Sequence, residues 1–233
     1  MASISTASDG SNSEGEGPGS SSSPPLSSTV SSASSAPSTK KSDYIRTATQ
    51  NYISRAANVL GAPNLNTRGK SVVQADATIR GDFGSPIHVG RYCYIERGVA
   101  LVPTVVPVSS DPLLAVVERS GYDDNSPPGE NERALPIIVG SHTRIGQNTR
   151  VQSVSVGSCV RVGRDCTLGP RSKVHDCCII EDGTLVPPDM VIPPFSRVRG
   201  SPGRIVGTLP ECCGGELVEG CVQDYLRFVR SLE

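Results

Sequence analysis

One period dominates this chain: from Val139 onward, a Val, Ile or Leu returns at every sixth residue. Such a period is neither the two-residue alternation of an ordinary strand nor the 3.6-residue period of a helix. It predicts a repeat architecture in which each six-residue unit supplies one short strand and one turn. The series contains one slip of a residue after its third member and runs through Val139, Ile145, Val151, Val156, Val162, Leu168, Val174, Ile180, Val186, Ile192 and Val198.

The neighbouring positions repeat as well. Glycine often follows the aliphatic residue directly, where a tight corner needs close backbone approach, and a small residue often lies four positions after it. Three such units close a triangular coil of about 18 residues, and successive coils stack as parallel strands about 4.8 Å apart. The predicted fold class is therefore mainly β, a single-stranded parallel β-helix. The glycines are Gly140, Gly146, Gly157, Gly163 and Gly169, and the small residues are Thr143, Thr149, Val160, Cys166, Ser172, Cys178 and Thr184.

Composition divides the chain into four parts. Residues 1–39 are rich in serine and contain no Lys or Arg, so we expect a disordered tail there. We expect an entry segment over 40–70 and the β-helix over 71–208, with an inserted Pro-rich loop over 103–136 whose role the sequence leaves open. Apolar spacing after Pro210 predicts a C-terminal helix over 209–233. Its expected apolar face consists of Leu217, Val218, Cys221, Val222, Tyr225, Leu226 and Val229.

Charge and hydropathy exclude several partners. The formal net charge is −1, which gives no electrostatic case for nucleic acid. No apolar run is long enough for a membrane span, and the first 39 residues lack the features of a signal peptide. We therefore expect a cytoplasmic protein with no direct membrane insertion.

The segment from Ile79 to Asp82, followed by Pro86 to Gly90, resembles a signature of the gamma-class carbonic anhydrases within the hexapeptide-repeat superfamily. This resemblance implies a left-handed β-helix in which Arg80 and Asp82 form a structural ion pair at a subunit interface. In the enzymes, three histidines from neighbouring subunits hold zinc and leave a position open for water.

The three metal-ligand positions carry other residues here: Val102, Gln147 and Gln152. Valine has no donor atom, and a glutamine amide is a poor zinc ligand. We therefore expect no metal, no cofactor and no catalytic residue. His88, His142 and His175 occupy different phases of the repeat and do not replace the lost ligands. The alternative is a gamma-carbonic-anhydrase-like or acyltransferase-like enzyme, in which His142 or His175 would serve as general base.

A closer resemblance extends over about residues 41–228. Residues 41–55 and the segment Leu209-Pro210-Glu211-Cys212 lie outside the hexapeptide rule and resemble the dynactin subunit 5 family. The resemblance implies a non-catalytic subunit of the dynactin pointed-end complex, which supports dynein-driven transport along microtubules on the cytoskeleton. The implied partners are the related β-helical dynactin subunit six, actin-related protein eleven, dynactin subunit four and dynein cargo adaptors. Which residues bind each partner is not evident from the sequence.

Overall fold

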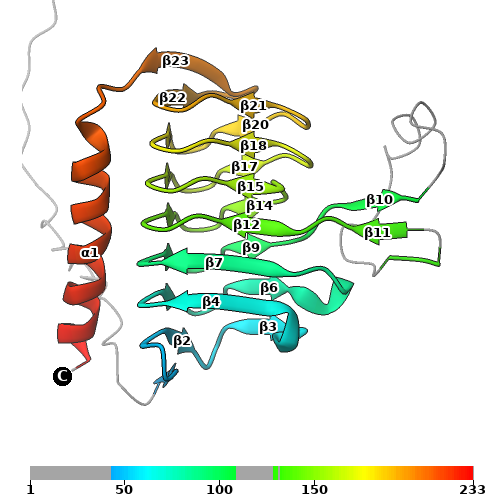
Figure 1. Ribbon diagram of the computed structural model, residues 1–233, viewed down its shortest axis with the longest axis vertical. Coiled ribbons are helices and arrows are strands. Elements are labelled where there is room, and N and C mark those ends of the chain that lie inside the picture. Colours follow the sequence, from blue (N-terminus) through cyan, green and yellow to red (C-terminus); the bar gives the residue numbers. More distant parts are fainter. Residues whose placement is uncertain (1–42, 109–127, 131, 233) are drawn as a thin grey trace, which may run out of the picture. The chain divides into compact units, whose positions relative to one another are not determined.

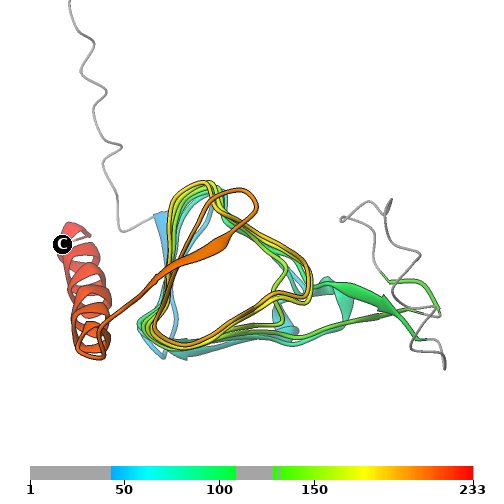
Figure 2. The ribbon, with the colours of Figure 1, turned by 90° about the horizontal axis from the view of Figure 1, so that it is seen from above.

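A computed structural model of the chain describes residues 43–108, 128–130 and 132–232. The expected tail over 1–39 and the middle of the loop over 103–136 lie outside the described residues. Within the described part, six complete coils stack into a triangular prism, as a left-handed parallel β-helix does (Figure 1 and Figure 2). The fold class predicted from the six-residue period is confirmed.

Each coil contributes one strand to each side of the prism. Sheet A has β1 (Tyr44–Arg46), β2 (Tyr52–Ser54), β5 (Val72–Val73), β8 (Tyr94–Ile95), β13 (Arg144–Ile145), β16 (Arg161–Val162), β19 (Ile179–Ile180), β22 (Ser196–Arg199) and β23 (Arg204–Thr208). Sheet B has β3 (Asn58–Leu60), β6 (Thr78–Arg80), β9 (Ala100–Leu101), β14 (Arg150–Val151), β17 (Thr167–Leu168) and β20 (Leu185–Val186). Sheet C has β4 (Leu65–Gly69), β7 (Ile87–Arg91), β12 (Ile137–Val139), β15 (Ser155–Val156), β18 (Lys173–Val174) and β21 (Val191–Ile192).

The repeating aliphatic residues fill the interior of the prism. All eleven members of the series from Val139 to Val198 are buried, and the small residues four positions later are buried beside them. The corners leave no room for larger groups: a Cβ on Gly140 would lie 2.5 Å from the backbone nitrogen of Ser158 in the next coil. The period therefore encodes both what fills the prism and how tightly its coils stack.

The slip in the period falls at a corner between sheets B and C. In the two coils above it, this corner contains a residue with left-handed backbone, Arg171 (φ 58°) and Asp189 (φ 59°). Residues 152–154 contain no such residue, and the corner is closed by a hydrogen bond between the hydroxyls of Ser153 and Ser172 (2.7 Å). The chain therefore turns at this corner with one residue fewer than at the same corner of the two following coils.

The sequence predicted that the β-helix starts at residue 71, but the first coil lies before this residue. Strands β2, β3 and β4 form a first coil within the expected entry segment and pair in parallel with β5, β6 and β7. Its aliphatic residues Ile53, Val59 and Leu65 also recur at intervals of six, and they are only partly buried because the coil lies at the end of the stack. A 3-10 turn, η2 (Ala62–Asn64), completes this coil.

The loop inserted between residues 103 and 136 starts and ends as a two-stranded ribbon. Strands β10 (Val105–Pro107) and β11 (Glu132–Ala134) pair antiparallel and project from the prism (Figure 1). Its base packs on a second turn, η3 (Gly81–Phe83), through the contact of Phe83, Val102 and Ala134.

The C-terminal helix α1 (Cys213–Ser231) stands beside the corner between sheets C and A (Figure 2). Six of the nine aromatic residues gather where its C-terminal half meets sheet A, outside the narrow prism. Two expectations for its apolar face were wrong: Leu226 is exposed, and Phe228, buried against Tyr44, Tyr52 and Tyr94, was missed. Among the described residues, no helix has the length and hydropathy of a membrane span.

Candidate functional site

Two of the three positions that correspond to zinc ligands in the enzymes lie close together in this chain, and the third lies apart from them. Val102 and Gln152 follow neighbouring strands of sheet B, whereas Gln147 lies at the corner between sheets A and B. Val102 is buried under Phe83 and Ala134 at the base of the ribbon. The described residues contain no cluster of three or more His, Cys, Asp or Glu side chains suited to a metal ion.

Arg80 and Asp82 form a two-pronged ion pair beside this buried cluster. Arg80 donates from Nε to Oδ1 and from a terminal nitrogen to Oδ2 of Asp82, both at 2.9 Å. The hydrogen bonds from Arg80 lower the pKa of Asp82. The guanidinium also lies 4.6 Å from the centre of the Phe83 ring, so the pair fixes the turn that carries Phe83.

The three histidines lie in different places. His88 and His175 are exposed, on β7 and after β18 respectively. His142 lies at the corner between sheets C and A, where its ring stacks on Tyr92 with centroids 5.4 Å apart. Partial burial lowers the pKa of His142. The arrangement offers no shared histidine site for acid–base chemistry.

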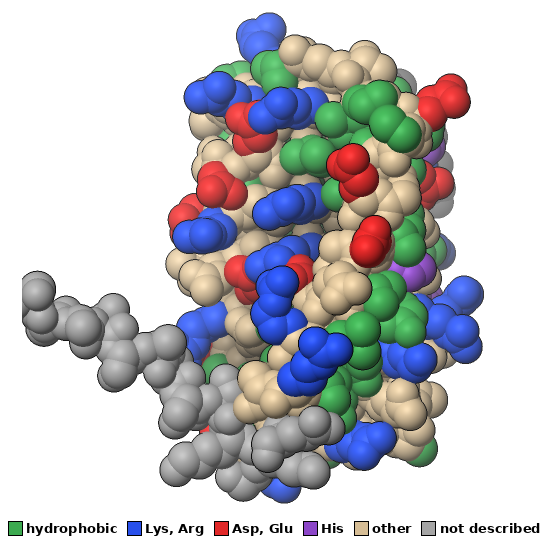
Figure 3. Space-filling view, turned by 90° about the vertical axis from the view of Figure 1, so that its left-hand side faces the viewer, with side chains coloured by type: hydrophobic (Ala, Val, Ile, Leu, Met, Phe, Trp, Pro, Cys, Tyr) green, Lys and Arg blue, Asp and Glu red, His purple; other side chains and the backbone are tan. Residues whose placement is uncertain are grey.

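The outer face of sheet A carries a ladder of long side chains that the sequence did not single out. Strand register aligns Tyr94, Arg144, Arg161, Ile179 and Arg197 on successive strands. All five directly precede an inward aliphatic residue, a signal that was available in the sequence. Figure 3 shows basic and acidic side chains interspersed over the molecule on this side.

Arg144 joins this ladder to α1. Its Nε donates to Glu96 Oε1 (2.8 Å), its other side forms an ion pair with Asp224 of α1, and its guanidinium lies over the Tyr94 ring. The Glu96 side chain is only 9% exposed, so it depends on Arg144 for its counter-charge. The helix is therefore fixed to sheet A by charge as well as by aromatic packing.

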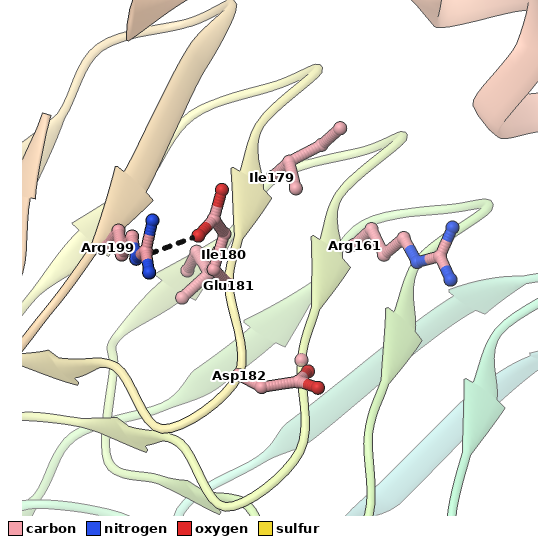
Figure 4. A pocket seen from close by; sticks show the side chains of 7 residues that line it. Arg161, Ile179, Ile180, Glu181, Asp182 and Arg199 are labelled. Carbon is pink, nitrogen blue, oxygen red and sulfur yellow. Dashed lines mark ion pairs between the residues drawn. The ribbon is translucent and has the colours of Figure 1, made fainter. Parts of the chain in front are cut away.

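Above Arg144 the ladder borders a depression of about 410 Å³. In Figure 4, Arg199 points toward Glu181, whereas the side chain of Arg161 extends away from Glu181 and Asp182. Glu181 accepts from Arg197 (2.6 Å) and pairs with Arg199 (3.3 Å). The described lining consists of Arg, Asp, Glu, Gly and Ile, so charged side chains of both signs border this depression.

Comparison with known proteins gives two kinds of likeness. A model of the dynactin subunit 5 family matches residues 129–232. Among solved structures, a hexapeptide transferase family protein from Anaplasma phagocytophilum is 15% identical, with 78% of this chain and 92% of that chain covered and a TM-score of 0.47. A maltose O-acetyltransferase from Clostridium difficile 630 is 18% identical, with 69% and 67% covered and a TM-score of 0.39.

Proposed function

We propose that the chain is a non-catalytic structural subunit of the dynactin pointed-end complex, because a model of the dynactin subunit 5 family matches residues 129–232. In this role it supports dynein-driven transport along microtubules in the cytoplasm. Its partners in the proposal are dynactin subunit six, actin-related protein eleven, dynactin subunit four and dynein cargo adaptors. The family match is the observation that carries this conclusion.

The prism suits a structural role. Its sides are continuous parallel sheets held by a close-packed interior, so their outer faces keep a fixed shape when a partner docks. The ladder of sheet A contains three arginines, and Glu96 and Glu181 beside it accept hydrogen bonds from Arg144 and Arg197. This combination of both charges favours partner selection by electrostatic complementarity.

The former ligand positions also support a non-catalytic function. Val102 contributes only apolar contact, and Gln152 is buried with its backbone carbonyl accepting from Thr104 Oγ1 (2.7 Å). We include in the proposal that Arg80 and Asp82 stabilise the prism surface next to the ribbon as a structural ion pair.

Affinity purification of the tagged chain from cells tests the proposal. Dynactin subunit six, actin-related protein eleven and dynactin subunit four should be recovered together with it. A tagged acyltransferase of the hexapeptide-repeat class, which shares the architecture alone, serves as the control and should recover none of them. Absence of all three from the purified chain would contradict the proposal.

The same purified sample tests the enzymatic alternative. A gamma-carbonic-anhydrase-like protein binds zinc and hydrates CO2, so elemental analysis and a CO2 hydration assay should both be negative under the structural proposal. Stoichiometric zinc together with CO2 hydration would favour the enzyme.

A further inference from the structure

A second depression, of about 390 Å³, lies at the corner between sheets C and A, where β4 and β7 end. Three basic side chains line it: Arg68 from β4, Arg91 from β7, and Lys70 from the turn that follows β4. We call these three residues the basic corner. The described residues that line the depression include no acidic side chain.

The backbone brings the three cations together. Gly69 pairs with Arg91 in the next coil, so the ends of β4 and β7 are aligned. Gly69 has φ 129° and approaches the preceding turn so closely that a Cβ would lie 2.7 Å from the carbonyl oxygen of Thr49. Lys70 then takes the left-handed corner conformation (φ 53°).

Lys70 is held in place before any ligand arrives. Its ammonium donates to the Tyr92 hydroxyl (3.0 Å) and lies 5.3 Å from the centre of the Tyr92 ring. Tyr92 is itself fixed, because it stacks on His142 and meets Tyr225 of α1 edge-on with centroids 5.7 Å apart. A cation fixed in this way loses little conformational entropy when it binds an anion.

The charges of the basic corner are not neutralised within the described residues. Arg68 and Arg91 are exposed and have no ion pair there. By contrast, Arg171 forms a two-pronged pair with Asp189. An anion would relieve the mutual repulsion of the three cations.

We propose that the basic corner binds a phosphorylated serine or threonine of a partner protein. A phosphomonoester has close to two negative charges at pH 7 and three acceptor oxygens, which matches two guanidinium groups and one ammonium. Arginine presents paired donors to phosphate, and lysine adds a compact point charge. An anionic bilayer is a poorer match, because stable attachment there takes about four to eight basic residues.

Fluorescence polarisation on the full chain tests this site with three probes: a short labelled peptide with one phosphoserine, its unphosphorylated counterpart, and vesicles containing phosphatidylserine. The phosphopeptide should bind saturably, and the unphosphorylated peptide at least about tenfold more weakly. Binding should weaken as salt rises. Preferential binding to the vesicles, equal affinity for the two peptides, or no saturable binding of the phosphopeptide would each overturn the proposal.

Matched variants locate the binding. The double variant Arg68→Gln with Arg91→Gln should weaken phosphopeptide binding about 100-fold, at about tenfold for each arginine. Arg161→Gln removes one positive charge from sheet A, as each of the two substitutions does at the basic corner, and should leave the affinity within about twofold. Circular dichroism checks that both proteins are folded. Undiminished binding by the folded double variant would contradict the assignment, and this outcome is independent of membership in a dynactin complex.

Discussion

Arg144 on β13 forms an ion pair with Asp224 of α1, a residue 80 positions later in the chain. This ion pair holds the C-terminal helix against the prism next to Glu96. The Glu96 carboxylate accepts a hydrogen bond from the same guanidinium. A helix with only one strongly apolar stripe thereby gains a second, polar attachment.

Replacement of Arg144 tests this attachment. Arg144→Gln leaves the buried Glu96 without a counter-charge and should lower the free energy of unfolding by about 2 kcal/mol, between the values for exposed and fully buried pairs. Arg227→Gln is the control, because Arg227 also pairs with Asp224 but is 79% exposed. Its effect should be below about 0.5 kcal/mol in urea denaturation. Equal losses of unfolding free energy in the two variants would show that the contacts of Arg144 with Glu96 and Asp224 stabilise the fold no more than an exposed ion pair does.

The inward and outward positions of the repeat should differ sharply in their tolerance of substitution. Leu168 is fully buried and Leu185, on the neighbouring strand of sheet B, is 42% exposed. Leu168→Ala should cost about 2–5 kcal/mol of unfolding free energy, and Leu185→Ala about 0.5 kcal/mol or less. Chemical denaturation monitored by circular dichroism measures both, and similar losses would be inconsistent with the assigned phase of the repeat.

The same substitution at two glycines should act with opposite sign. A Cβ on Gly140 would meet backbone atoms of the next coil, so Gly140→Ala should destabilise the prism by about 1–3 kcal/mol. Gly220 lies within α1 with open space around its Cβ, so Gly220→Ala should stabilise by about 0.5–1 kcal/mol. Thermal melting reports both changes. A neutral Gly140→Ala would mean that the corners are not close-packed.

Thiol chemistry should follow burial. Burial raises the pKa of Cys93 to about 11 and that of Cys221 to about 12, so at pH 8 both remain almost entirely protonated and unreactive toward a disulfide reagent. The exposed Cys212 should react first, and Cys212→Ser should remove this fast phase. Cys93 and Cys221 should react only after unfolding. Mass spectrometry of the labelled folded chain identifies the sites, and early modification of Cys93 would contradict its burial.

Local repetition explains how much of the fold the sequence predicted. Each inward aliphatic residue meets an equivalent residue one coil away, so a period read along the chain translates directly into contacts such as Ile145 beside Val162. The first coil was missed although Ile53, Val59 and Leu65 keep the period, because no glycine directly follows these residues as it does in several later coils.

The surface features depend on contacts that periodicity does not encode. The partners of Arg144 lie 48 and 80 residues away, and nothing in their spacing links them. The position of α1 depends on aromatic side chains of sheet A and of its neighbouring corner, which the six-residue period does not encode. Loss of ligands at Val102, Gln147 and Gln152 was visible in the sequence, but the burial of Val102 beneath the ribbon required the structure.

Quantitative mass spectrometry of dynactin is the most direct test of the claim we propose, that this chain is a structural subunit of dynactin. Dynactin purified from cells through a tag on dynactin subunit six should contain the chain in a constant molar ratio to that subunit across independent preparations. Absence of the chain from such preparations, while it is abundant in the starting extract, would contradict the claim.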